Sequence, residues 1–334
     1  MRLAIMSFAH LHAEAYINNL RNALDVEFVG FSDLDAERGT HFAGVFKTKW
    51  YDSHEDLLKE GLDGVVICSE NARHRELVEM AAGAGVPILC EKPIEVTLED
   101  ARAMRDVCKA NNVTFMTAFP VRFSSSVQQV KNALDRGDLG RIYAINGINH
   151  SEIPLEHRAW FAQKALAGGG AVMDHTVHLV DAYRWFFGCE VVEVYAEVDN
   201  LFYRGEVDVD TAGIVTLTME NGVFATIDCS WSRPTFYPRW GHLKMDIVGE
   251  KGFMTLDGQA EHLTVYSKKL SRNPTWMNYG NDSNQHMINE FVAAIRENRE
   301  PAVTWRDGYE AVRVALACFE SAESGQPVRL EVGQ

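Results

Sequence analysis

About the first 120 residues alternate short apolar runs with amphipathic segments of helical length, and this alternation constrains the fold more than any other feature. The apolar runs, which we expect to be buried strands, are residues 3–7, 27–33, 64–69, 87–92 and 114–119. Capping patterns such as Ser53 with Asp56 predict helix starts between them. Strands that are apolar on both faces and joined by helices form a parallel sheet covered on each side. We therefore expect residues 1–121 to form a doubly wound α/β domain.

From residue 122 onward, strands follow one another without helices between them. The expected strands are residues 141–147, 191–198, 212–219, 223–231, 244–249, 253–256 and 262–267, and the expected helices are about 124–136, 158–187, 283–297 and 306–323. Asn221-Gly222 is typical of a tight hairpin turn. This order predicts an open antiparallel sheet with helices on one face. We expect residues 122–334 to form an α+β domain for substrate binding and oligomerisation, whose uncovered sheet face pairs copies into a homodimer or homotetramer.

Composition and charge exclude several classes of partner. A formal net charge of -15 on 334 residues would repel nucleic acid and anionic membranes. No apolar stretch reaches the length of a membrane span, and the short run at the start has no cleavage site after it. The six cysteines form no CxxC pair, which argues against a disulfide framework and a zinc knuckle. We therefore expect a cytoplasmic protein that acts on a small molecule.

The turn after the first expected strand is the place where a doubly wound sheet binds a dinucleotide. Its residues are, in order, Ser7, Phe8, Ala9, His10, Leu11 and His12, with no glycine among them. Dinucleotide-binding turns use glycines so that the backbone can approach a pyrophosphate. Small side chains at Ser7 and Ala9, and the N–H groups of the next helix, still suit an anion. A tight turn without a ligand is the alternative.

Asp33 ends the second expected strand, about 24 residues after this turn. This is close to the spacing at which a carboxylate binds the ribose hydroxyls of a dinucleotide. A negative charge there repels a 2′-phosphate, so NAD is favoured over NADP. The alternative role for Asp33 is a helix N-cap, because Asp35-Ala36-Glu37 follows.

Two further motifs carry candidate chemistry. Lys92 ends the expected strand at 87–92, just before Pro93, so we expect its side chain to point into a cleft; a surface lysine is the alternative. Gly168–Gly170 would allow a ligand to approach the backbone before a helix begins. Asp174 and His178 are four residues apart on that helix and share one face, where the carboxylate can orient the imidazole. An exposed intrahelical pair is the alternative. His175 lies on another face, so we expect no metal site here.

These motifs together resemble the glucose–fructose oxidoreductase and inositol dehydrogenase family (Gfo/Idh/MocA). The resemblance rests on Glu91-Lys92-Pro93 and on the pattern GGG-x3-D-x3-H-x2-D that ends at Asp181. It extends to Ser69-Glu70-Asn71 with His74, where the family has a T-P-N-x-x-H loop, and to residues 119–123 and 321–330. The similarity runs through nearly the whole chain. The glycine-free turn and Pro120, where many members have Asn, depart from the family pattern.

The resemblance implies a Rossmann domain with NAD(P), a C-terminal antiparallel-sheet domain, and sugar or polyol substrates. It implies that Lys92 contacts the reacting oxygen and that His178 is the acid–base group, with Asp174 beside them and Asn71 near the nicotinamide ribose. The candidate cofactor-binding residues are Ser7, Phe8, Ala9, His10, His12, Asp33, Ser69, Asn71, His74, Glu91 and Lys92. The candidate substrate-binding residues are Arg122, Arg158, Trp160 and His175.

The leading hypothesis is therefore an oxidoreductase that moves a hydride between NAD(H) and a sugar, polyol or keto-sugar. Histidine titrates near neutrality and can take the hydroxyl proton, while a nearby ammonium stabilises the developing alkoxide. One alternative is a glycoside hydrolase or epimerase whose bound NAD is transiently reduced and then restored. Another is a ligand-binding protein that has lost its cofactor.

Overall fold

The computed structural model describes residues 1–258, 260–267, 269, 273–280 and 282–332. They form two compact units. The first comprises Met1–Pro120, Leu155–Gly168 and Ser283–Val312, and the second comprises Val121–Pro154, Gly169–Asp282 and Arg313–Gln334. Two later segments therefore join the N-terminal residues in the first unit. The domain boundary expected at residue 121 stays a prediction about how the chain divides functionally.

The first unit holds a six-stranded sheet, and all its strands run parallel, as predicted. The strand order is β3-β2-β1-β4-β5-β6. The bounds are β1 Arg2–Met6, β2 Glu27–Ser32, β3 Trp50–Tyr51, β4 Gly64–Ile67, β5 Ile88–Cys90 and β6 Phe115–Thr117. The chain leaves β1 in one direction and β4 in the other, so the switch point of this sheet lies between these two strands. The carboxyl ends there are where such sheets bind ligands.

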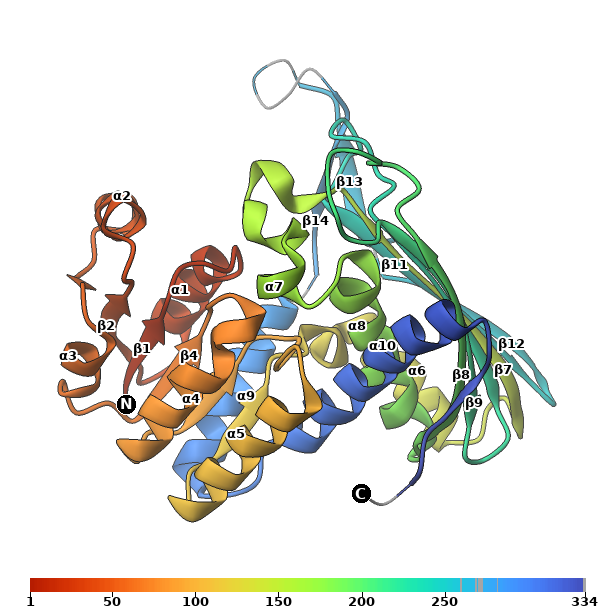
Figure 1. The fold of residues 1–334 in the computed structure, drawn as a ribbon, viewed down its shortest axis with the longest axis horizontal. Coiled ribbons are helices and arrows are strands. Elements are labelled where there is room, and N and C mark those ends of the chain that lie inside the picture. Colours follow the sequence, from red (N-terminus) through yellow and green to blue (C-terminus); the bar gives the residue numbers. More distant parts are fainter. Residues whose placement is uncertain (259, 268, 270–272, 281, 333–334) are drawn as a thin grey trace. The chain divides into compact units, whose positions relative to one another are not determined.

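The helices of the first unit cover both faces of this sheet. They are α1 Ala13–Asn22, α2 Ala36–Phe46, α3 His54–Leu58, α4 His74–Gly83, α5 Leu98–Ala110, α7 Lys164–Ala167 and α9 Ser283–Glu297, with short 3-10 helices η1 Asn71–Arg73 and η4 Ala159–Ala162. The Ser53 hydroxyl accepts the Asp56 N–H and caps α3, which confirms that predicted helix start. Right-handed crossovers in opposite directions place α1 and α4 on different faces of the sheet (Figure 1).

The second unit is built on a seven-stranded sheet in the order β12-β11-β7-β10-β9-β8-β15. Its bounds are β7 Ile142–Ser151, β8 Val191–Asp199, β9 Ala212–Met219, β10 Phe224–Ser230, β11 Gly241–Gly249, β12 Gly252–Asp257 and β15 Val328–Arg329. All neighbours are antiparallel except β7 and β10, which run parallel. Among the described residues, the expected strand at 262–267 does not join this sheet, because β13 His262–Val265 pairs with β14 Thr275–Asn278 in a separate two-stranded sheet.

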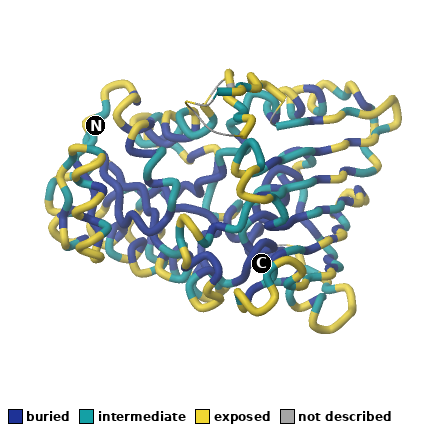
Figure 2. The backbone as a smooth tube through the Cα atoms, turned by 90° about the horizontal axis from the view of Figure 1, so that it is seen from above, coloured by how far each residue is buried: buried dark blue, intermediate teal, exposed yellow. Residues whose placement is uncertain are grey.

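One face of the second sheet packs against α8 Ala171–Phe187, which contacts β7, β9 and β10. The remaining helical elements are α6 Ser125–Asp135, α10 Trp305–Ser324 and the 3-10 helices η2 Pro120–Phe123 and η3 Pro154–Glu156. On β9 and β10, buried residues alternate with more exposed ones, as expected for a sheet with one covered face. Figure 2 shows how buried and exposed residues are distributed along the backbone. Among the helices that the structure describes, none has the length and apolar character of a membrane-spanning segment.

Candidate functional site

The turn after β1 adopts a glycine-like path without glycine. Ser7 has a φ of +67°, the left-handed conformation that favours glycine at the first position of a dinucleotide-binding turn. Its hydroxyl oxygen accepts the Ala9 N–H at 3.2 Å. The Phe8 ring is buried, with its centroid 4.3 Å from that of Phe31 and 4.9 Å from that of Phe42. Phe8 thus anchors the turn in the core through its side chain, and only its backbone remains as a candidate ligand contact.

Asp33 follows β2 and is fully buried. One carboxylate oxygen accepts the Phe8 N–H at 2.7 Å, and the other accepts the Asp35 N–H at 2.8 Å. Arg38 makes two further hydrogen bonds of 2.8 Å to the same carboxylate. Asp35, not Asp33, is the N-cap of α2, because its carboxylate accepts the Arg38 N–H. A ribose hydroxyl that binds Asp33 must therefore replace one of these four donors.

Arg38 is a site residue that sequence reasoning missed. Burial lowers its pKa, but the hydrogen bonds to Asp33 and the negative charge of that carboxylate outweigh burial and raise the pKa above its usual value. A basic residue in the first turns of the helix after Asp33 was the available signal. Arg38 and the predicted residues Ser7, Asp33 and Ser69 line one pocket, together with Leu34, His54, Glu70, Arg73, Glu76 and Leu77. The carboxyl ends of β1, β2 and β4 thus meet at one polar pocket.

The loop after β4 places Asn71 and His74 inside the first unit. The Asn71 amide nitrogen donates to the Ala167 carbonyl at 2.9 Å, whereas its buried Oδ1 has no hydrogen-bond partner among the described residues. The Nδ1 of His74 lies 3.0 Å from the Pro93 carbonyl oxygen. Burial lowers the pKa of His74 to about 4, so the ring is neutral near pH 7. His74 connects this loop to the loop after β5, and a direct cofactor contact stays a prediction.

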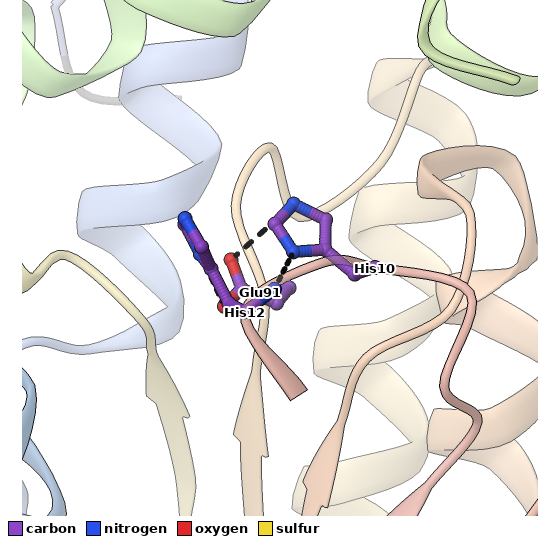
Figure 3. Close-up of side chains that lie close together, drawn as sticks. All are labelled: His10, His12 and Glu91. Carbon is purple, nitrogen blue, oxygen red and sulfur yellow. Dashed lines mark hydrogen bonds and ion pairs between the residues drawn. The ribbon is translucent and has the colours of Figure 1, made fainter. Parts of the chain in front are cut away.

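Glu91 and Lys92 follow β5, and both are buried. The Lys92 N–H donates to Glu91 Oε2 at 3.1 Å. The Nδ1 of His12 lies 3.0 Å from Glu91 Oε1, and the Nε2 of His10 lies 4.0 Å from Glu91 Oε2 (Figure 3). Burial raises the pKa of Glu91, but the positive charges of His10, His12 and Lys92 and the His12 hydrogen bond outweigh it, so the net pKa is well below the usual range. Glu91 is therefore an ionised, buried carboxylate.

Arg158 and Trp160 both contact the turn after β1. The Arg158 Nε donates to the Ala9 carbonyl at 3.0 Å, and the Trp160 indole nitrogen donates to the same oxygen at 2.9 Å. Arg158 also pairs with Glu14 at 2.8 Å. Both residues belong to the first unit, where they hold Ala9 in place. Their predicted contact with substrate stays a prediction.

In the second unit, the glycine run packs against protein. A Cβ on Gly170 would lie 1.8 Å from the Asp210 carbonyl oxygen, so only glycine fits there. The Asp210 carboxylate accepts the N–H groups of Gly170 and Val172, each at 2.7 Å, at the start of α8. Burial raises the pKa of Asp210, although these two bonds act in the opposite direction. Gly170 therefore admits the backbone of Asp210, not the expected ligand, and the capping role of Asp210 had no local sequence signal.

Asp174 and His178 are distinguished by their exposure from the residues around them on α8. Every residue from 171 to 184 is buried except these two, which are half-buried. They lie one helical turn apart, which confirms the predicted shared face. The Trp231 indole nitrogen donates to Asp174 at 3.4 Å. The otherwise buried stretch 171–184 of α8 thus presents one carboxylate and one imidazole.

His175 and Arg122, both predicted to bind substrate, have buried protein partners. The Nδ1 of His175 lies 3.5 Å from Asp174, and its Nε2 lies 2.9 Å from the Ser151 hydroxyl. The guanidinium of Arg122 makes two hydrogen bonds to Asp181, at 2.8 and 2.6 Å. Their substrate roles stay predictions. Lys92 belongs to the first unit and His178 to the second, so their approach to one substrate oxygen also stays a prediction.

Comparisons with known proteins cover both units. A family model described as an oxidoreductase family with an NAD-binding Rossmann fold matches residues 5–119, and a GFO/IDH/MocA C-terminal domain model matches residues 127–255. The chain is 27% identical to the myo-inositol 2-dehydrogenase of Thermotoga maritima, over 99% of each protein. It is 28% identical to the D-apiose dehydrogenase of Paraburkholderia graminis, over 96% of this chain and 86% of that enzyme.

A solved structure shows the same fold over nearly the whole chain. GenD2 from gentamicin A biosynthesis, in complex with NAD, has a TM-score of 0.89 at 22% identity, covering 99% of this chain and 97% of that one. The two family models, which describe the two halves of one family, together span most of the sequence. The chain therefore belongs to the GFO/IDH/MocA family of oxidoreductases and carries an NAD-binding Rossmann fold in residues 5–119.

Proposed function

We propose that the protein transfers a hydride between NAD(H) and a carbinol or carbonyl carbon of a sugar, polyol or keto-sugar. The observation that carries this proposal is the half-buried pair Asp174 and His178, which stand out in the otherwise buried stretch 171–184 of α8. The substrate class is supported by the relatives named above, which are an inositol dehydrogenase and an apiose dehydrogenase.

The residues of the first unit fit a dinucleotide. The pocket lined by Ser7, Asp33 and Ser69 lies at the carboxyl ends of three parallel strands, where doubly wound sheets bind nucleotides. The buried Oδ1 of Asn71 offers an acceptor that no described residue fills, as a ribose hydroxyl or carboxamide would. When bound, NAD accepts a hydride from the substrate carbon, or NADH donates one.

The acid–base work falls to His178 and Lys92. In the oxidative direction His178 removes the hydroxyl proton, and in the reductive direction it returns one. The Lys92 ammonium stabilises negative charge on the substrate oxygen and raises the fraction of hydroxyl that is ionised. Asp174, one turn before His178, orients the imidazole and favours its protonated form. This scheme requires Lys92 and His178 to meet at one oxygen.

We further propose that residues 1–121 bind the dinucleotide and residues 122–334 bind substrate and pair with a second copy. The uncovered face of the second sheet supports the pairing. Phe224 and Phe253 are 57% and 75% exposed there, and Val248 is 47% exposed. The register places Phe253 opposite Val248, while Val248 and Phe224 both lie opposite Ala144, so an apolar row crosses four strands. Such a row favours a self-complementary interface. A cytoplasmic location, predicted from the cysteine pattern, belongs to the same proposal.

Substrate screening tests the reaction. Sugars and polyols are offered with NAD, and keto-sugars with NADH, while nicotinamide absorbance is followed. Net formation or loss of NADH is the expected result, and a matched assay with NADP gives the cofactor preference. Substrate conversion without net absorbance change would replace the proposal with the hydrolase or epimerase alternative. Failure to bind either dinucleotide in calorimetry would favour the ligand-binding alternative.

Sedimentation tests the pairing. We expect the wild-type chain to sediment as a dimer or tetramer, and Phe224→Glu to shift it toward the monomer. Val45→Glu adds the same charge at an exposed apolar position on α2 of the first unit, which is not part of this sheet, so it serves as the matched control. A wild-type monomer at all concentrations would refute the pairing without affecting the reaction.

A further inference from the structure

We propose that His10, His12 and Glu91 form a binding site for one divalent transition-metal ion, with zinc as the leading candidate. The two histidines follow β1 and the glutamate follows β5, so three side chains distant in sequence converge at the carboxyl edge of the first sheet (Figure 3). One ligand atom from each residue lies within 4.8 Å of the other two. Among the described residues, His10, His12 and Glu91 are the group of histidine, cysteine and carboxylate side chains whose ligand atoms lie this close together.

The distances are close to those that one ion requires. Zinc binds imidazole nitrogen and carboxylate oxygen at about 2.0–2.2 Å, so its donor atoms lie about 3–3.6 Å from one another. His12 Nδ1 and Glu91 Oε1 are 3.0 Å apart, within that spacing. His10 Nε2 and Glu91 Oε2 are 4.0 Å apart, so a small rotation of either side chain completes the set.

The charge of the cluster also favours a cation. Glu91 is fully buried, and a buried carboxylate group is favoured by a cation beside it. A divalent ion supplies that positive charge while both imidazoles stay neutral and act as ligands. Two nitrogens and one oxygen are the donors that zinc, cobalt, nickel and iron prefer, whereas magnesium and calcium prefer oxygen alone.

Two local contacts oppose metal binding, and neither is large enough to prevent it. The His12 N–H donates to His10 Nδ1 at 3.2 Å, and this bond is lost when His10 coordinates through Nε2 and carries its proton on Nδ1. One long backbone hydrogen bond contributes little compared with three metal–ligand bonds. The positive charge of Lys92 also acts on Glu91 and reduces the attraction for a cation.

The exposed fractions of the three ligand side chains indicate the path by which an ion would enter the site. The side chains of His10 and Glu91 are 1% and 0% exposed, whereas that of His12 is 29% exposed. The ion therefore enters past His12, and His12 is the ligand whose replacement least disturbs the core. Three protein ligands leave a fourth coordination position for water or an anionic oxygen. This inference does not depend on the proposed hydride transfer.

The experiment uses the full chain, freed of metal by chelation and of nucleotide by gel filtration. It is titrated with Co²⁺, followed by visible absorbance, and with Zn²⁺, followed by calorimetry. We expect one equivalent of either ion to bind, and His12→Ala to weaken binding at least about tenfold. Binding is also expected to weaken as the solution is acidified, because protons compete with the metal for the imidazole nitrogens.

Two variants separate this site from other histidines. His150→Ala removes a histidine that also pairs with a carboxylate, Asp228, at 2.8 Å, and it should bind metal as the wild type does. His12→Gln retains a hydrogen bond to Glu91 but removes the nitrogen ligand, and it replaces His12→Ala if circular dichroism shows that the alanine variant unfolds. Equal metal binding by wild type and either His12 variant would overturn the proposal, as would a wild type that binds no Co²⁺.

Discussion

The carboxylates in the two regions that carry the proposed chemistry differ in their burial and in the lengths of their contacts. At the carboxyl edge of the first sheet, Asp33 and Glu91 are fully buried, and short hydrogen bonds from neighbouring backbone and side chains hold them in place. On α8 of the second unit, Asp174 is half-buried, and its contacts to Trp231 and His175 are longer, at 3.4 and 3.5 Å.

We interpret this difference as a division between cofactor binding in the first unit and proton transfer in the second. A carboxylate that neighbouring donors saturate has a stable charge and position, which suits recognition of a cofactor. A half-buried imidazole can reach a substrate, and histidine is the side chain best suited to gain and lose a proton near neutral pH. We therefore assign recognition to the strand ends of the first unit and proton transfer to α8.

The largest expected effect tests that assignment at the reacting groups. We expect Lys92→Met and His178→Ala each to lower kcat by about a hundredfold or more, because each removes a positioned charge or acid–base group. Steady-state kinetics with the substrate found by screening gives the measurement. His286→Ala removes an exposed histidine on α9 and serves as the control, with kcat within about twofold of wild type. Near-normal kcat in both variants would end the assignment of proton transfer to α8.

The second prediction concerns the stability of the first unit as pH falls. His74 has a folded pKa of about 4 because it is buried, while an unfolded histidine has a pKa of about 6.5. Between these pH values the unfolded chain binds more protons, so folding stability falls as pH is lowered. From about pH 7 to pH 5, His74 alone accounts for a loss of about 2 kcal/mol in the free energy of unfolding.

Urea unfolding of wild type and His74→Gln at both pH values measures this loss. The glutamine variant can still donate to the Pro93 carbonyl but does not titrate, so its stability should depend less on pH than that of the wild type. His286→Ala, whose histidine is exposed, should keep the wild-type pH dependence. Identical pH dependence in wild type and His74→Gln would show that His74 is not held neutral.

The third prediction addresses cofactor choice at Asp33. We expect Asp33→Ala to weaken NAD binding by about tenfold and to tighten NADP binding, because Arg38 loses its carboxylate partner and becomes available to a 2′-phosphate. Calorimetry with both dinucleotides gives the two dissociation constants. Asp35→Ala, which removes the N-cap of α2, should cost stability but leave the ratio of the two constants unchanged. An unchanged ratio in Asp33→Ala would remove Asp33 from cofactor recognition.

Sequence reasoning succeeded where the signal is local. Strand ends are marked by a change from apolar to polar residues, and this placed Ser7, Asp33, Ser69 and Lys92 at one edge of the first sheet. Helical spacing placed Asp174 and His178 on one face of α8. Both patterns reflect the periodicity of a single element.

Features that depend on contacts between distant segments were not predicted. Residues 155–168 and 283–312 belong to the first unit, although they follow the strand–helix series. Asp210 was missed because its partners, Gly170 and Val172, are set by the fold and not by residue spacing. Arg38 lies only five residues after its partner Asp33, so its signal was local and was overlooked. The parallel pairing of β7 with β10 was also not predicted, because the periodicity of a strand does not indicate which other strand will lie beside it.

The smallest expected effect concerns the conformation of the turn itself. Ser7 has a left-handed backbone conformation that costs a non-glycine residue about 1–2 kcal/mol and that glycine adopts without strain. Replacing Ser7 with glycine would recover only part of this cost, because glycine loses more conformational entropy on folding. We expect Ser7→Gly to be more stable than Ser7→Ala by about 1 kcal/mol in urea unfolding, and to bind NAD at least as tightly as wild type. Ser7→Ala keeps the strain and loses the hydroxyl that accepts the Ala9 N–H. If the alanine variant were the more stable, the turn after β1 would not require a glycine-like conformation. The strand ends of the first unit would then recognise the cofactor through side chains such as Asp33, and not through the path of the backbone at this turn.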